Sequence, residues 1–251
     1  MDIMNYALEN FIDYCDEMII VEESSLAIAT EGTIKDALGK IGAGLNNVLY
    51  KLRTWLQSFV QWVRSLFYRL NKTPYLTVNM EFYNQTTSTI DAIHKLGPGD
   101  AIKNQVEKCI RVNPGKAEPE LYKLKELYQD LQGDYDTLTD YANKIPEPKE
   151  NGIKTRVPTS KLNSMKTTFD NEIKEANELI KNIPAHINAL NQQLQNTQPD
   201  KVNDQRLTHI GKVVYVSEML SANFLIKRGE FCKKLIESLF KHGQVSIEQK
   251  E

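Results

Sequence analysis

Residues 34–70 read IKDALGKIGAGLNNVLYKLRTWLQSFVQWVRSLFYRL. Apolar side chains recur in this stretch at intervals of three and four residues, which is the period of an amphipathic α-helix. The apolar stripe consists of Ile34, Leu38, Ile41, Leu45, Val48, Leu49, Leu52, Trp55, Leu56, Phe59, Val60, Val63, Phe67 and Leu70. Because a stripe of this length needs other helices to cover it, the stretch predicts an all-α fold of long amphipathic helices.

Glycines weaken the first third of this predicted helix. Gly39, Gly42 and Gly44 each cost about 1 kcal/mol of helix stability relative to alanine. We therefore expect a bend near Gly42, or two separate helices, and we expect Pro74 to end the element. Residues 32–73 form a basic amphipathic helical arm in this interpretation.

The C-terminal part of the chain predicts a second pair of long helices. Residues 145–158 combine prolines and a glycine with polar residues, which is typical of a linker. Beyond them, residues 159–197 and 202–242 show the helical period, and Pro184 is expected to kink the first of the two. Residues 159–243 therefore predict an antiparallel helical hairpin, which the earlier helices complete into a bundle.

The remaining segments are less regular. Residues 74–144 form a helical region in which the piece from Leu76 to Phe82 alternates between apolar and polar residues. This alternation fits either a short strand or the start of a helix. Residues 244–251 are expected to form a polar tail.

Formal charge is segregated near the N-terminus. Residues 1–34 contain eight carboxylates and neither Lys nor Arg, whereas residues 35–72 contain seven cations and a single carboxylate, Asp36. The net charge of the whole chain is −2, so residues 73–251 sum to zero. Opposed charged blocks of this kind are typical of tails, propeptides and interaction arms rather than of a folded core.

No catalytic or metal-binding motif is present in the sequence. The three cysteines and four histidines are scattered, without CxxC, HExxH or Gly-x-Ser-x-Gly spacing. Glu172, Glu175 and Glu178 alternate with lysines on one predicted helix, so we expect them to form a solvated face. We therefore expect no enzymatic activity, no cofactor and no metal site.

The N-terminal residues also lack the pattern of a targeting signal. A secretory signal begins with positive charge and an apolar run, whereas the first residues here are acidic. No run of about 18 apolar residues predicts a membrane-spanning helix. We expect the chain to start in the cytoplasm.

The basic arm has three interpretations. It is a core helix whose stripe is buried, a membrane-surface helix with an aromatic face, or a nucleic-acid-binding helix. The aromatic face, which would contact a membrane or a partner, consists of Trp55, Phe59, Trp62 and Phe67. The basic face consists of Lys35, Lys40, Lys51, Arg53, Arg64 and Arg69.

The junction between the two charged blocks carries a resemblance to a known family. Ile28-Ala29-Thr30-Glu31, followed by Gly32, resembles the site cut by prohead proteases of large contractile-tailed bacteriophages. That signature is a branched aliphatic residue, two mostly small or polar residues, and a glutamate, with a small residue after the cut. Residues 1–31 are similar to the acidic amphipathic head-targeting peptides of internal head proteins in that group.

This resemblance implies a virion protein of a phage head. The prohead protease would read Ile28 and Glu31, cut after Glu31 and leave Gly32 as the first residue. The implied partners are that protease and other virion proteins. A membrane surface, packaged DNA and a second copy of the chain remain open as partners of the basic arm. The implied location is the phage head, after assembly in the host cytoplasm.

A second hypothesis needs no processing. The chain would be a cytoplasmic helical scaffold or a peripheral membrane-binding protein, in which the acidic N-terminus shields the basic helix. A membrane or a partner would then displace the acidic segment.

Overall fold

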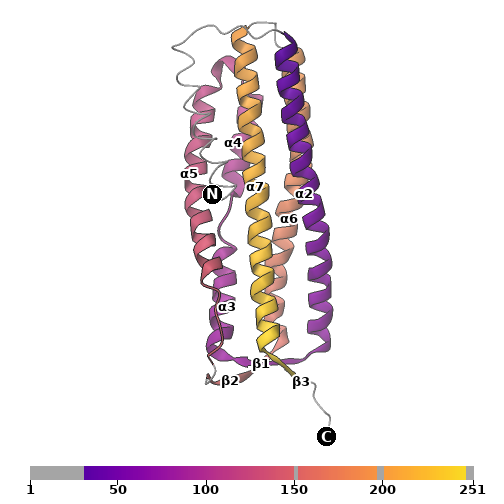
Figure 1. Cartoon of the computed structure of the whole chain (residues 1–251), viewed down its shortest axis with the longest axis vertical. Coiled ribbons are helices and arrows are strands. Elements are labelled where there is room, and N and C mark those ends of the chain that lie inside the picture. Colours follow the sequence, from indigo (N-terminus) through magenta and orange to yellow (C-terminus); the bar gives the residue numbers. More distant parts are fainter. Residues whose placement is uncertain (1–30, 150–151, 197–200, 247–251) are drawn as a thin grey trace. The chain divides into compact units, whose positions relative to one another are not determined.

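The structure, a computed structural model, describes residues 31–149, 152–196 and 201–246 and is all-α with one small sheet (Figure 1). The α-helices are α2 (Glu31–Lys72), α3 (Met80–Ile93), α4 (Gly99–Arg111), α5 (Glu118–Asn143), α6 (Met165–Asn196) and α7 (Lys201–His242). The predicted fold class is therefore confirmed. The chain divides into two compact units, and each unit combines segments that are distant in the sequence.

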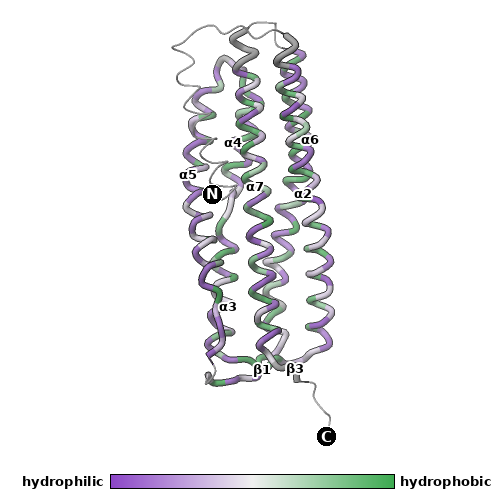
Figure 2. Tube along the Cα trace, in the orientation of Figure 1, coloured by the Kyte–Doolittle hydropathy of each residue, from purple (hydrophilic) through white to green (hydrophobic). Residues whose placement is uncertain are grey.

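Unit 1 contains the part of α2 up to Arg53, residues Pro98–Gly133 with α4 and the first part of α5, and the described residues of Glu178–Phe224 from α6 and α7. Its core is apolar and closely packed. The buried side chains include Leu45, Leu52, Ile102, Val106, Leu121, Leu124, Ile183, Leu207, Ile210 and Val214. Hydrophobic and hydrophilic residues are interspersed along the helices (Figure 2). α2 buries one apolar stripe, whereas α7 is buried around most of its circumference.

α2 is a single helix from Glu31 to Lys72, so of the two alternatives expected near Gly42 the division into two helices is wrong, while the bend stays a prediction. The glycines of its first third bring the backbone close to its neighbours. An added Cβ at Gly44 would lie 2.8 Å from the ring of Tyr215 on α7, and one at Gly42 would lie 4.0 Å from Ile187 on α6. Close packing against α6 and α7 therefore offsets the conformational cost of these glycines.

Unit 2 contains Thr54–Gly97, Asp134–Asn177 and the described residues from Leu225 onward. Its sheet has the strand order β2-β1-β3, with β1 (Tyr75–Asn79) in the centre, β2 (Lys154–Pro158) on one side and β3 (Gln244–Ser246) on the other. Both pairings are antiparallel, with Tyr75 opposite Pro158 in one and opposite Ser246 in the other. The sheet thus joins the segment after α2 to the segment after α7.

The alternation of apolar and polar residues that begins at Leu76 corresponds to a short strand, β1. The side chains of Leu76 and Val78 are buried, as expected for one face of a short strand. Asn79 then caps α3, because its side-chain oxygen accepts a hydrogen bond of 3.0 Å from the backbone N–H of Phe82. β1 therefore ends at Asn79, and α3 begins at the next residue, Met80.

Two predicted segment boundaries are wrong for the same reason. Residues 154–158 at the end of the predicted linker form β2, and residues 244–246 at the start of the predicted polar tail form β3. Both strands are short and become ordered by pairing with β1, so their own sequences carry little strand signal. α6 and α7 form the predicted antiparallel helices, and α6 continues as one helix through Pro184.

Candidate functional site: the face of α2 and two buried polar clusters

The outer face of α2 is basic. All six predicted basic-face side chains are exposed: Lys35, Lys40, Lys51, Arg53, Arg64 and Arg69. They lie outward because the apolar stripe of the same helix is directed into the cores of the two units. Lys72, in the last turn, is also exposed. The basic face therefore exists on the surface as the sequence predicts.

The cations of this face differ in their surroundings. In unit 2, the Arg69 guanidinium lies 5.1 Å from the Phe240 ring centroid, and the Lys72 ammonium lies 4.2 Å from that of Tyr68. In unit 1, no described residue forms an ion pair with Lys40, Lys51 or Arg53. The positive charge of the basic face in unit 1 is therefore not neutralised by ion pairs with described residues.

The aromatic face is a packing surface in unit 2. Trp55 is 8 % exposed and Phe59 is 1 % exposed, while Trp62 and Phe67 are half-buried. Phe59 stacks on Trp55 with ring centroids 4.9 Å apart, and the rings of Trp62 and Phe169 of α6 are nearly perpendicular with centroids 5.4 Å apart. This arrangement matches the core-helix interpretation of the stripe and leaves little aromatic surface for a membrane.

Trp55 of the aromatic face also forms a hydrogen bond within unit 2. The indole N–H of Trp55 donates a hydrogen bond of 3.1 Å to Glu230 Oε1 on α7. α7 lies close to α2 near Trp55. The close approach is shown by Gly229, where an added Cβ would lie 2.4 Å from the Trp55 ring. The tryptophan is thus held by packing and by a hydrogen bond together.

The predicted processing residues lie at the edge of the described chain. Ile28 lies outside the described residues. Glu31 and Gly32 are the first two described residues, and both belong to α2.

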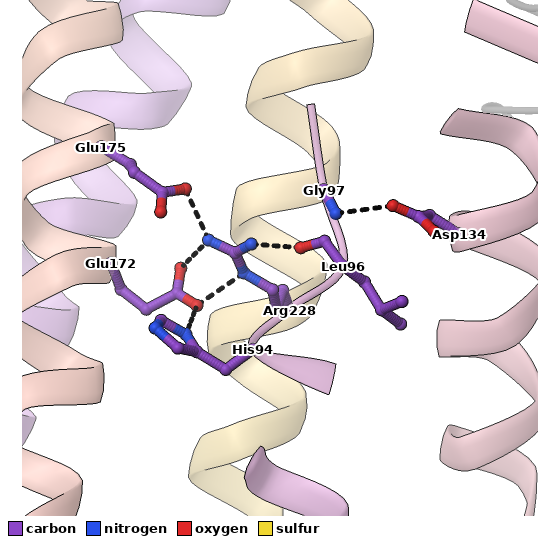
Figure 3. Close-up of polar contacts among 7 residues, drawn as sticks. All are labelled: His94, Leu96, Gly97, Asp134, Glu172, Glu175 and Arg228. Carbon is purple, nitrogen blue, oxygen red and sulfur yellow. Dashed lines mark hydrogen bonds and ion pairs between the residues drawn. The ribbon is translucent and has the colours of Figure 1, made fainter. Parts of the chain in front are cut away.

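A buried ion-pair cluster lies in unit 2 (Figure 3). Arg228 of α7 is 3 % exposed and pairs with Glu172 of α6, which is 0 % exposed, through Nε–Oε1 at 2.6 Å and Nη2–Oε2 at 3.0 Å. Arg228 Nη2 also donates to Glu175 at 2.6 Å, and Nη1 donates to the carbonyl of Leu96. His94 Nδ1 lies 3.3 Å from Glu172 Oε1. One guanidinium thus joins α6, α7 and the segment after α3.

Electrostatics keep this cluster charged. Burial alone would lower the pKa of Arg228, but Glu172 and Glu175 outweigh burial and raise it. Burial, together with the negative charge of Glu172, also raises the pKa of the Cys232 thiol. Cys232 therefore stays a protonated, unreactive core residue rather than a nucleophile.

Unit 1 contains a second buried polar pair. His186 Nδ1 on α6 lies 2.6 Å from Glu218 Oε1 on α7, and both side chains are less than a tenth exposed. Tyr128 of α5 is completely buried nearby, and burial raises the pKa of its hydroxyl. Each unit therefore aligns α6 with α7 through one buried polar contact in addition to apolar packing.

The sequence interpretation missed these clusters. Glu172 is buried, so its predicted place on a solvated face is wrong, whereas Glu175 and Glu178 are partly exposed as expected. A signal was present. Glu172 comes three residues after Phe169 and four before Ala176, so it occupies a position of the apolar stripe, and Arg228 does the same between Phe224 and Phe231. A charge on each of two neighbouring stripes predicts a buried pair.

The described residues offer little other chemistry for a functional site. No group of three or more His, Cys, Asp or Glu side chains among the described residues is placed to hold a metal ion. None of the described helices combines the length and the apolar content that crossing a membrane requires. Comparison of the chain with protein-family models, curated proteins and solved structures finds no match.

Proposed function

We propose that the chain is a non-enzymatic virion protein of a large tailed bacteriophage. Residues 1–31 target it to the prohead, the prohead protease cuts after Glu31, and Gly32 becomes the first residue. The processed protein is a helical protein whose basic α2 face meets an anionic partner inside the particle, either packaged DNA or another virion protein.

One observation carries this proposal. The sequence Ile28-Ala29-Thr30-Glu31-Gly32 lies where the acidic block ends and where the basic amphipathic helix predicted from the sequence begins. A cut at this bond removes all eight carboxylates of residues 1–34 in one step and leaves the seven cations of residues 35–72 in place. The charge of the N-terminal region would change sign without any change in the helical units.

The mass and the N-terminal sequence of the protein from its native source test the proposal. A chain that begins at Gly32 is the expected result. A chain that begins at Met1 overturns it and favours the unprocessed scaffold, in which the acidic block stays part of the working protein.

A cleavage assay with the phage's prohead protease sharpens the test. Glu31→Gln removes the carboxylate at the cut and should abolish cleavage. The matched control Glu9→Gln changes the same chemical group within the segment and should be cut like the unaltered chain. Equal cleavage of both variants would place the processing site elsewhere.

A further inference from the structure

The unit 1 part of α2 presents a surface that we call the α2 patch. It consists of Lys35, Lys40, Lys51, Arg53 and Tyr50. All five side chains are exposed, and Tyr50 is 72 % exposed although it is a large aromatic residue. At 100° per residue these positions lie on the outer half of the helix, with Tyr50 near the middle of that half. The patch is therefore an elongated, mainly basic surface that also contains the exposed Asp36, and its aromatic side chain lies near Lys51 and Arg53 at one end.

The described side chains of the neighbouring helices contribute little negative charge to the patch. α2 packs against α6 and α7 in unit 1, as the contacts of Gly42 and Gly44 show. The described side chains of these helices in unit 1 include only two carboxylates. Glu178 pairs with Lys103 at 3.1 Å, and Glu218 is buried against His186. An occupant of the patch must therefore bring its own negative charge.

The chain itself contains a segment with the required chemistry. Residues 1–30 contain seven carboxylates and no cation, and they also contain apolar residues such as Phe11 and Ile12 that can contact Tyr50. This segment is joined covalently to α2 at Glu31. A tether of this kind gives the segment a local concentration in the millimolar range, so several weak surface ion pairs are enough for occupancy.

The length of the segment suits the patch. Lys51 lies 20 positions beyond Glu31, which is about 30 Å along the helix at 1.5 Å per residue. Thirty residues cover about 45 Å at the same rise and about 100 Å when extended. Once the chain reverses direction near Glu31, the carboxylates between Asp2 and Glu23 can therefore reach every cation of the patch.

We propose that residues 1–30 bind back onto the α2 patch and neutralise it within the intact chain. The segment then acts as an internal mask: it covers the α2 patch, so other polyanions must displace it before they can bind. The inference does not require cleavage. If the chain is cut after Glu31 as proposed above, cleavage is the step that uncovers the patch.

Zero-length carbodiimide coupling of the intact chain tests the mask directly. The reagent joins lysine amines to carboxylates that are in contact, and mass spectrometry of the peptides identifies the pairs. Coupling of Lys40 and Lys51 to carboxylates between Asp2 and Glu23 is expected, and high salt should abolish it. The exposed Lys108 of α4 and Lys123 of α5 serve as controls within unit 1 and should couple to the segment far less. Equal coupling of all four lysines, or none to the segment, overturns the proposal.

Binding of a short duplex DNA supplies the second measurement. Neutralising the segment with Asp13→Asn, Asp16→Asn and Glu17→Gln should tighten binding by about tenfold, the combined effect of three exposed ion pairs. Adding Lys40→Glu and Lys51→Glu should remove that gain. If the unaltered chain binds the duplex as tightly as the neutralised variant, the patch is open and nucleic acid is its occupant, which overturns the mask. Helix content by circular dichroism confirms that each variant is folded.

These experiments separate the two proposals. The intact chain is made in a host without the phage protease, so a failure of coupling does not bear on cleavage after Glu31. The mass of the native protein, in turn, does not report whether residues 1–30 cover the patch before the cut.

Discussion

Arg228 and Glu172 form an ion pair that is almost completely removed from water. Their side chains are 3 % and 0 % exposed, and two nitrogen–oxygen contacts of 2.6 and 3.0 Å join them. Neither charge can be hydrated if the other is lost. The pair therefore fixes the alignment of α6 with α7 in unit 2 more strictly than interchangeable apolar contacts do.

Glu172→Gln should lower the free energy of unfolding by about 3–5 kcal/mol, because it leaves the Arg228 guanidinium buried without its main counter-charge. Urea denaturation followed by circular dichroism measures the loss. The matched control is Glu175→Gln, which changes the second carboxylate that contacts the Arg228 guanidinium. That carboxylate is 44 % exposed, so its loss should cost about 1 kcal/mol or less. Equal losses in the two variants would contradict the dominant role of Glu172.

Gly229→Ala should destabilise the protein by about 1–3 kcal/mol, because the new methyl group would lie 2.4 Å from the Trp55 ring and 3.4 Å from that of Phe59. Gly39→Ala is the control within another helix, where an added Cβ meets nothing within 4 Å. There the higher helix propensity of alanine should stabilise the protein by up to about 1 kcal/mol. Thermal denaturation compares the two, and shifts of the same sign would refute the packing argument.

Acidification should remove a stabilising contribution of Glu120. The side-chain amide of Gln105 donates a hydrogen bond of 2.7 Å to the Glu120 carboxylate, and this contact, aided by Lys123, lowers the pKa of Glu120 below its ordinary value of 4.5. A lowered pKa in the folded state means that the contribution is present above about pH 4.5 and is lost as the pH falls through the folded pKa. Denaturation across this range, compared with Glu120→Gln, should show the stability advantage of the unaltered chain shrinking on acidification. A constant difference would contradict this assignment.

Anionic vesicles should leave the tryptophan fluorescence of the intact chain unchanged. Trp55 is 8 % exposed and donates its indole N–H to Glu230, and Phe59 beside it is 1 % exposed. Insertion of this face into a bilayer would require unit 2 to open. Vesicles containing phosphatidylglycerol test this, with brominated acyl chains as quenchers. A blue shift or strong quenching would show that the aromatic face leaves the core to bind lipid.

The apolar period was sufficient to predict the helices. The stripes of α2, α6 and α7 are long, and their inward and outward positions follow directly from the three- and four-residue spacing. The outward position of Lys40 and Lys51 followed from the same geometry. A pattern within one helix thus predicts which of its faces is buried.

Features that depend on two segments were not predicted. β2 and β3 exist because each pairs with β1, and nothing within Lys154–Pro158 or Gln244–Ser246 alone specifies that pairing. Likewise, the burial of Glu172 depends on Arg228, which is 56 residues away. The sequence period identifies the face on which a residue lies, but its partner is determined by how the helices pack.

The pairing of β1 with β3 has a consequence for how the protein is made. Tyr75 lies opposite Ser246, and unit 1 likewise needs residues as far along the chain as Phe224. Neither unit can therefore be completed from an early nascent fragment, and final folding follows synthesis of nearly the whole polypeptide. Until then, the helices emerging from the ribosome expose apolar stripes, so this protein should depend strongly on chaperones during translation.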